Sequence, residues 1–186
     1  MGYQQALEKA WDDLLAITRE GETHAVKLLS DTYTVDLKNR TVLSDSCNIP
    51  AKDYTSIIIL HYLAKKLKLG SLPEPSGQWI DFREIEGGEA YFPAFKKRTI
   101  DRILKKYGMT PQAILKTPQS LPYEKGLPGD AGIVLTVMDK APILITISKA
   151  DEEFGPDTNI LFDKTISDIF CTEDIVVLTE IVVHYL

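Results

Sequence analysis

Apolar residues recur at helical spacing in three stretches of the chain, residues 3–19, 50–68 and 89–107. In each stretch apolar side chains stand three or four positions apart with charged residues between them, which is the pattern of an amphipathic helix. Gly21 and Gly70 follow the first two stretches and are typical helix stops. Pro93 fits only the first turn of the third helix, because it has no backbone N–H for a later turn. We therefore expect that helix to begin close to Ala90–Phe92.

Alternating apolar and polar residues predict the strands. Residues 32–43 are typical of a hairpin, with a turn at residues 38–40, and residues 78–85 predict a further strand. The clearest β signal is a pair of apolar runs within residues 131–148, on either side of a turn around residues 139–142. Because both runs are apolar on both faces, we expect them at the centre of a sheet that helices cover.

The remaining segments complete the expected fold. Residues 109–116 predict a short helical segment. Thr172 is a suitable N-cap for a last helix over Ile175–Tyr185, with Glu173 and Asp174 in its first turn. The pattern predicts a single α+β domain over residues 1–186, in which about four to five helices pack on a mostly antiparallel sheet that contains the 131–148 hairpin.

The composition changes this picture little. The 186 residues are 44% hydrophobic and 26% charged, so the chain can bury a core without disulfides or a metal. No apolar run reaches the roughly 18 residues of a membrane span, and the first residues lack the basic and apolar regions of a secretory signal. We therefore expect a soluble cytoplasmic protein with no membrane partner. The sequence does not indicate its oligomeric state.

Charge is distributed unevenly along the chain. The formal net charge is −6, and residues 151–186 contain nine acids and one base. This argues against nucleic acid as a partner of the C-terminal part, because phosphate contacts supply most non-specific affinity for it, and it leaves binding elsewhere open. A basic run, Lys96–Lys106, is expected on the polar side of the third helix. It is consistent with a solvated helix face, or with a surface that contacts phosphates or an acidic partner.

No sequence motif assigns a metal, a cofactor or a nucleophile. His24, His61 and His184 lack the spacing of metal ligands, and residues 151–162 depart from an EF-hand loop at its Gly and Glu positions. Cys47 and Cys171 stand alone, so we expect buried thiols. The acidic residues that follow Cys171 are expected to raise its pKa. We assign no metal site and no catalytic residue, and the cofactor stays unknown.

Several short segments together resemble a known family. They are Leu60-His61-Tyr62-Leu63; Trp79-Ile80-Asp81-Phe82-Arg83-Glu84, followed by Gly87-Gly88 and by Tyr91, Phe95 and Arg98; Gly129-Asp130; Asp151-Glu152-Glu153-Phe154; Ile160-Leu161-Phe162-Asp163; and Thr172-Glu173-Asp174. From about residue 50 onward, the chain resembles a prokaryotic domain family of unknown function found mainly in anaerobic bacteria and archaea. Some members carry an N-terminal four-cysteine iron–sulfur segment like that of corrinoid-protein subunits. This sequence contains no such segment, so the resemblance implies no cluster. It implies no established activity and points to corrinoid or one-carbon metabolism by context alone.

The same segments predict a ligand site. Large aromatic residues stand close to charged ones there, and an apolar pocket with a few convergent charges is typical of ligand sites. The alternative is that Arg83 and Arg98 pair with Glu84, Glu153 or Asp163 and fasten the helices to the sheet. The candidate ligand-binding residues are Trp79, Asp81, Arg83, Glu84, Tyr91, Arg98, Asp151, Glu153 and Asp163.

Three functions are consistent with these observations. The leading hypothesis is a domain that binds a small ligand or a partner, accessory to anaerobic metabolism. It requires the segment 79–84 and the turn 151–154 to meet around a cavity. The second is a hydrolase or lyase in which Asp81, His61 and a carboxylate from Glu152, Glu153 or Asp163 lie within hydrogen-bond reach. The third is an adaptor that binds a partner or nucleic acid through the basic helix 96–106.

Overall fold

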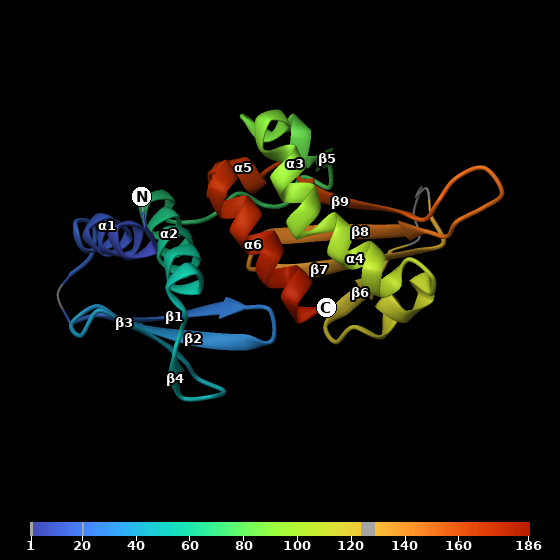
Figure 1. Ribbon diagram of the computed structural model, residues 1–186. Helices are drawn as coiled ribbons and strands as arrows, with labels where there is room; N and C mark the ends of the chain where they lie inside the picture. Colours follow the sequence, from blue (N-terminus) through green and yellow to red (C-terminus); the bar gives the residue numbers. More distant parts are fainter. Residues whose placement is uncertain (1, 20, 124–128) are drawn as a thin grey trace. The chain divides into compact units, whose positions relative to one another are not determined.

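The computed structural model describes residues 2–19, 21–123 and 129–186. The chain divides into two compact units, Met1–Pro73 and Glu74–Leu186. Each unit combines helices with an antiparallel sheet (Figure 1), so the predicted α+β class is confirmed. Six α-helices are found within the described residues, one more than the upper end of the expected range. The assignment of the whole chain to a single domain stays a prediction.

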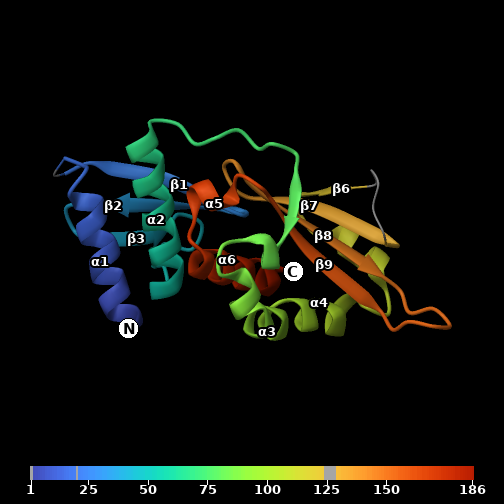
Figure 2. The same cartoon turned by 90° about the horizontal axis from the view of Figure 1, so that it is seen from above.

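The first unit is a four-stranded sheet with two helices. Its strands follow one another in the order β1-β2-β3-β4, and each neighbouring pair is antiparallel. The two helices lie side by side on one face of the sheet (Figures 1 and 2), where the apolar residues of both layers are buried. The elements are α1 (Tyr3–Leu15), β1 (Thr23–Leu28), β2 (Asp31–Asp36), β3 (Thr41–Ser44), β4 (Ile49–Pro50) and α2 (Asp53–Leu69).

The sequence pattern anticipates most of this unit. Both helices and the hairpin of β2 and β3 lie where they are expected, and Gly70 follows α2 with a positive φ of 74°. Strand β1 is not anticipated, because only Val26 and Leu28 are buried in it. A strand with so few buried side chains carries a weak alternation.

The second unit is a five-stranded sheet with helices on one face. The strand order is β5-β9-β8-β7-β6, and all four pairs are antiparallel. Figures 1 and 2 show α3, α4 and α6 together in one layer against this sheet. The elements are β5 (Trp79–Asp81), the 3₁₀ helix η1 (Phe82–Glu84), α3 (Gly88–Arg98), α4 (Ile100–Tyr107), the 3₁₀ segment η2 (Pro111–Lys116), β6 (Ser120–Pro122), β7 (Ala131–Met138), β8 (Ala141–Ser148), β9 (Asp157–Asp163), α5 (Ile166–Ile169) and α6 (Thr172–Tyr185).

The core of the second unit lies between the helical layer and the sheet. Strands β7 and β8 form the predicted central hairpin and are buried along most of their length. Three phenylalanines from three elements meet there. Phe82 and Phe95 stack with ring centroids 4.1 Å apart, and Phe162 of β9 packs against Phe95 at 6.2 Å. Such pairs contribute beyond the area that they bury.

The expected third helix is two helices in the structure. The chain breaks at Thr99, where φ is −125° and ψ is −71°. Thr99 is fully buried and its hydroxyl donates to the carbonyl of Phe95 at 2.7 Å. Helix α3 begins at Gly88, earlier than Ala90–Phe92, so Pro93 lies inside it. A β-carbon on Gly88 would lie 1.9 Å from the carbonyl oxygen of Phe82, so this early start requires glycine.

The structure differs from the sequence prediction at two further places in this unit. Thr172 is the first residue of α6 rather than its N-cap, and its hydroxyl donates to the carbonyl of Glu86 at 2.5 Å. Strand β9 lies inside the sheet, between β5 and β8, where the sequence pattern predicts no strand. Its burial alternates from Thr158 onward within an otherwise acidic stretch. In the described part of the chain, no helix combines the length and apolar character that crossing a membrane demands.

Candidate functional site

The structure brings part of the predicted site together at one end of β9. Strand β5 pairs with β9 so that Trp79 lies opposite Asp163 and Asp81 lies opposite Leu161. Directly paired residues point to the same face of a sheet, so Trp79 and Asp163 share one face. The segment 79–84 and the end of the segment 160–163 are therefore neighbours.

Asp163 is the most deeply buried of the predicted residues, with 1% of its surface exposed. Its carboxylate accepts hydrogen bonds from the backbone N–H groups of Ser76 (3.0 Å), Gly77 (2.7 Å) and Thr165 (3.0 Å). The hydroxyls of Ser76 and Thr165 also donate to it, at 3.0 and 2.9 Å. Burial alone would raise the pKa of Asp163, but these hydrogen bonds outweigh it and hold the pKa below its ordinary value. The carboxylate therefore fastens two loops to the end of β9.

Asp81, Arg83 and Glu84 form hydrogen bonds with one another. Asp81 accepts from the backbone N–H and the Nε of Arg83, both at 2.8 Å, and Glu84 accepts from the backbone N–H of Asp81 at 2.7 Å. This is a capping box for η1. Partial burial would raise the pKa of Asp81, but the bonds from Arg83 outweigh it and lower the pKa. The Arg83 guanidinium also lies 4.7 Å from the ring centroid of Phe92, a cation–π contact.

Tyr91 and Arg98 connect α3 to α6. The Tyr91 hydroxyl donates to Glu173 at 3.2 Å, and Arg98 Nε lies 3.3 Å from Glu180. Structural pairing, the alternative to a pocket, therefore occurs, but the partners differ from those expected. Arg83 pairs with Asp81, and Arg98 with Glu180.

The predicted aromatic cluster is divided between the two faces of the sheet. Ile80 lies opposite Phe162, on the face that carries the phenylalanine core. Trp79 therefore points to the other face, since side chains alternate along a strand. There its ring meets Tyr123 edge to face at 6.2 Å.

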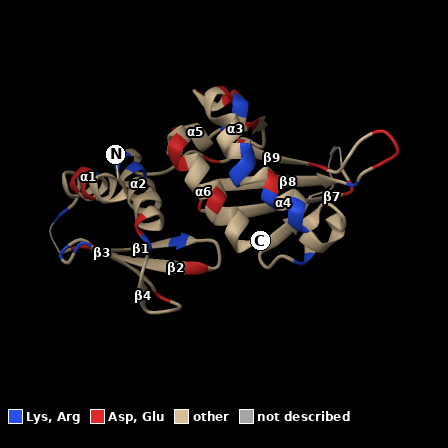
Figure 3. Ribbon diagram, viewed as in Figure 1, with Lys and Arg blue, Asp and Glu red and all other residues tan. Residues whose placement is uncertain are grey.

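Asp151 and Glu153 lie away from these residues, at the opposite end of β9. Their loop joins β8 to β9, where Ser148 pairs with Asp157. Six residue steps separate Asp157 from Asp163, about 20 Å of strand. Figure 1 labels β5 and β9, and Figure 3, in the same view, shows the acidic tip of this loop at the other end of β9 from β5. The Asp151 carboxylate accepts from the backbone N–H groups of Glu153 (2.9 Å) and Phe154 (2.7 Å), and these bonds lower its pKa.

A cavity of about 510 Å³ opens beside the β5 end of β9. Glu84 is the one predicted residue in its lining. The hydroxyls of Ser76 and Thr165 line it too, but their protons are committed to Asp163. The lining residues are Ser76, Ile80, Glu84, Lys164, Thr165, Ser167 and Asp168.

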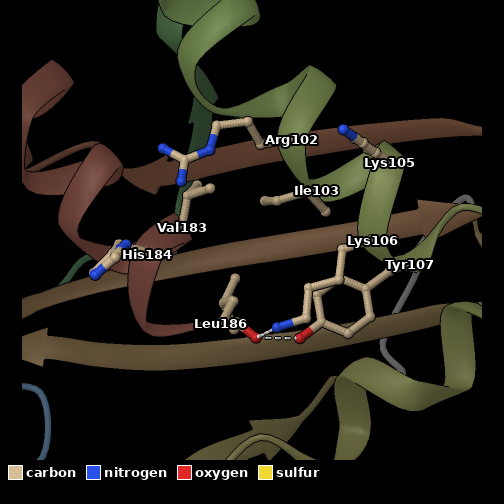
Figure 4. A pocket seen from close by; sticks show the side chains of 8 residues that line it. All are labelled: Arg102, Ile103, Lys105, Lys106, Tyr107, Val183, His184 and Leu186. Atoms are coloured by element: carbon tan, nitrogen blue, oxygen red, sulfur yellow. Dashed lines mark hydrogen bonds between the residues drawn. The ribbon is translucent and has the colours of Figure 1, made fainter.

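A second cavity, of about 500 Å³, lies between α4 and α6 and is called the α4–α6 groove. Figure 4 shows Arg102 reaching from α4 toward α6, beside Val183. At the other end of the groove, Lys106 Nζ and the Tyr107 hydroxyl both donate to the main-chain oxygen of Leu186, the hydroxyl at 2.5 Å. The lining residues are Arg102, Ile103, Lys105, Lys106, Tyr107, Val183, His184 and Leu186.

The amphipathic pattern of the two helices produces this groove. On α4, Ile103 and Tyr107 are buried against the sheet, which leaves Arg102, Lys105 and Lys106 at the surface. On α6, Val183 is buried and His184 is exposed. The floor of the groove is therefore apolar and its rim basic.

Ion pairs divide the basic run into two parts. Lys96 pairs with Asp101, and Arg98 pairs with Glu180. Within the described residues, Arg102 and Lys105 have no ion pair with a carboxylate. Figure 3 shows that Lys and Arg continue along α3 and α4. Arg102 and Lys105 therefore line the groove without such an ion pair, and the sequence signal for them is the spacing of three and four residues from Arg102 to Lys105 and Lys106.

The remaining reactive groups lie outside both cavities. His61 lies on α2 in the first unit, so the hydrolase or lyase hypothesis stays a prediction. Both cysteine side chains are exposed, so the prediction of buried thiols is wrong. The Cys171 thiol is nevertheless partly buried, and this partial burial together with the nearby Asp174 and Glu173 raises its pKa to about 11, as expected in direction. No group of three or more His, Cys, Asp or Glu side chains that could hold a metal ion occurs in the part of the chain that was described.

Comparison with known proteins places the chain in a family. A family model described as a domain of unknown function, DUF3786, matches residues 7–185. The chain belongs to this family, which confirms the resemblance to a family of unknown function. No curated protein and no solved structure matches the chain.

Proposed function

We propose that the second unit is a binding domain for a small anionic ligand, which it holds in the α4–α6 groove. One observation carries this proposal. Arg102, Lys105, Lys106 and His184 all line a single cavity of about 500 Å³, and none of its eight lining residues is Asp or Glu. A cavity of this size is typical of small-molecule sites.

The surroundings of the groove strengthen its attraction for an anion. Ile103 and Val183 form an apolar floor, which limits water beneath a bound ligand. A charge attraction is stronger where water is excluded. Arg102 offers a planar guanidinium that binds a phosphate or carboxylate through two parallel hydrogen bonds. A compact anion with a small apolar part therefore fits both the rim and the floor.

The resemblance supplies the first compounds to test, but no contact in the structure supports one of them. Corrinoids, folates and nucleotides all carry phosphate or carboxylate groups, so each is chemically suited to a basic groove. The anaerobic and cytoplasmic setting stays a prediction of the sequence.

A thermal-shift screen tests the proposal. The full chain is melted with orthophosphate, pyrophosphate, ATP, folate, cobalamin and acetate at constant ionic strength. A ligand present at 100 times its Kd stabilises the folded form by about 2.7 kcal/mol, which corresponds to a rise in Tm of roughly 5–10 °C for a chain of this size. Lys105→Gln should reduce the shift.

The matched control is Lys97→Gln, which removes the same charge from the same basic run outside the groove. It should leave the shift unchanged. The proposal fails if no anion raises the Tm, or if the two lysine variants reduce the shift equally. A short DNA duplex included in the same screen tests the adaptor hypothesis. Strong DNA binding that both variants weaken alike would favour the adaptor over the groove.

A further inference from the structure

The arrangement of charge in the α4–α6 groove indicates what kind of anion it takes, and this inference rests on the proposed function. We propose that the groove recognises a diphosphate group and takes it without a divalent metal ion. The first part follows from the spacing of the basic residues, and the second from the composition of the lining.

The permanent charges of the groove are distributed over one turn of α4. Arg102 and Lys106 are four residues apart, about 6 Å along the helix axis. The Arg102 guanidinium lies beside Val183 and the Lys106 ammonium contacts the oxygen of Leu186, at the other end of the groove (Figure 4). Two linked phosphoryl groups are therefore better placed than one carboxylate to contact both. His184 of α6 also lines the cavity, and its ring carries a further N–H donor. Three permanent positive charges match the charge of a diphosphate better than that of one carboxylate.

The donors at the two ends of the groove differ in whether they already form contacts within the chain. At the Leu186 end, Lys106 and Tyr107 already converge on one oxygen atom, which shows that donors from α4 can hold an oxygen there. An ammonium has three N–H donors, so Lys106 can keep this contact and still reach a ligand. At the other end, no carboxylate of the described chain forms an ion pair with Arg102, whose guanidinium suits a phosphoryl group.

The eight lining residues of the groove include none of the side chains through which proteins usually hold Mg²⁺ beside a phosphate. Proteins hold Mg²⁺ beside phosphates through one or two carboxylates. None of the eight lining residues is Asp or Glu, and the carboxylates nearest in sequence are engaged, Asp101 with Lys96 and Glu180 with Arg98. The lysines and Arg102 supply the positive charge instead. A diphosphate already bound to Mg²⁺ therefore brings a dication into a positive groove and binds less well.

Calorimetric titration of the full chain tests both parts. Inorganic pyrophosphate, orthophosphate and acetate are titrated at equal ionic strength, first with EDTA and then with excess Mg²⁺. Pyrophosphate should bind at least tenfold more tightly than orthophosphate, and acetate weakest. Excess Mg²⁺ should weaken pyrophosphate binding severalfold. Arg102→Gln should bring the pyrophosphate Kd close to that of orthophosphate, while Lys97→Gln keeps the difference.

The outcomes separate this inference from the proposed function. Equal Kd values for pyrophosphate and orthophosphate, or tighter pyrophosphate binding in Mg²⁺, overturn the inference. The proposed function then stands if Lys105→Gln still weakens the binding of the other anions. Absence of binding by all three probes, with no shift in the anion screen, overturns both. Unchanged melting temperatures of the unliganded variants establish that they fold.

Discussion

Replacing Asp163 with asparagine removes one charge and one acceptor oxygen from a point where five donors converge. One carboxylate oxygen accepts from the backbone N–H and the hydroxyl of both Ser76 and Thr165, and the other accepts from the N–H of Gly77. Asparagine keeps the first oxygen but presents an NH₂ group in place of the second. The Gly77 N–H then faces a donor and stays unsatisfied in a buried site.

The expected cost follows from these two losses. A buried N–H without an acceptor costs about 1–3 kcal/mol, and hydrogen bonds to a neutral acceptor are weaker than those to a charged one by roughly 1 kcal/mol. Because the effects are not additive, we expect Asp163→Asn to lower the free energy of unfolding by about 2–4 kcal/mol. Asp157→Asn is the matched control. It lies on the same strand with an exposed side chain, and it should change stability by no more than about 0.5 kcal/mol.

Native-state hydrogen exchange reports this loss in the unit that contains the change. Amides of β8 exchange through opening of the sheet, so their exchange should be faster by roughly 30- to 700-fold in Asp163→Asn. The reasoning is refuted if β8 exchanges in Asp163→Asn as it does in Asp157→Asn.

The pH dependence provides a second check on Asp163. Its folded-state pKa lies below the ordinary value, so its stabilising contribution is complete above about pH 4 and is lost as the pH falls through the folded-state pKa. The stability difference between wild type and Asp163→Asn should therefore be constant from pH 8 to pH 5 and shrink below about pH 4. A difference that grew on acidification would contradict the assigned hydrogen bonds.

Two other positions give independent predictions. Gly88→Ala should lower the free energy of unfolding in urea by about 3 kcal/mol or more, because the new β-carbon meets the carbonyl oxygen of Phe82. The control Gly155→Ala should leave the free energy of unfolding unchanged, because open space surrounds Gly155. For Cys171, whose pKa is about 11, iodoacetamide labelling followed by mass spectrometry should accelerate about tenfold per pH unit from pH 8 to pH 10, because only the thiolate reacts. A labelling rate that levels off below pH 10 would contradict the raised pKa of Cys171. Labelling of the exposed Cys47 in the same digest confirms that the reagent is active.

Elements with a strong apolar period could be predicted from the sequence, and those with mixed polarity could not. The hairpin of β7 and β8 and the helix α2 lie almost where expected, since their buried residues recur without interruption. The break at Thr99 escaped prediction because the apolar period continues through it. What stops the helix is a buried hydroxyl that bonds to the Phe95 carbonyl, a tertiary detail with no signature in the pattern.

The missed strand β9 explains why the predicted site is only partly assembled. The sequence suggested that the segment 79–84 meets an acidic stretch, and it does meet the end of that stretch at Asp163. Because the sequence pattern does not predict residues 157–163 as a strand, it does not show that Asp151 and Glu153 lie beyond the far end of β9, a strand about 20 Å long. The pairing of Asp81 with Arg83 was not predicted either. The sequence pattern predicts one strand over residues 78–85, whereas in the structure the strand ends at Asp81 and Asp81 caps the 3₁₀ helix η1.

The sequence did not indicate the groove, because the net charge of a long segment does not show where its individual charged side chains lie. The C-terminal 36 residues carry nine acids and one base, which argues against nucleic acid as a partner of that part of the chain. Yet this part contributes His184 to a basic cavity, because α6 presents Glu180 to Arg98 and turns His184 toward the groove one helical turn later. Ion pairs neutralise Lys96 and Arg98 but leave Arg102 and Lys105 uncompensated. An anion responds to the charges within about one Debye length, roughly 8 Å at physiological salt, so the groove attracts it even though the chain as a whole is acidic.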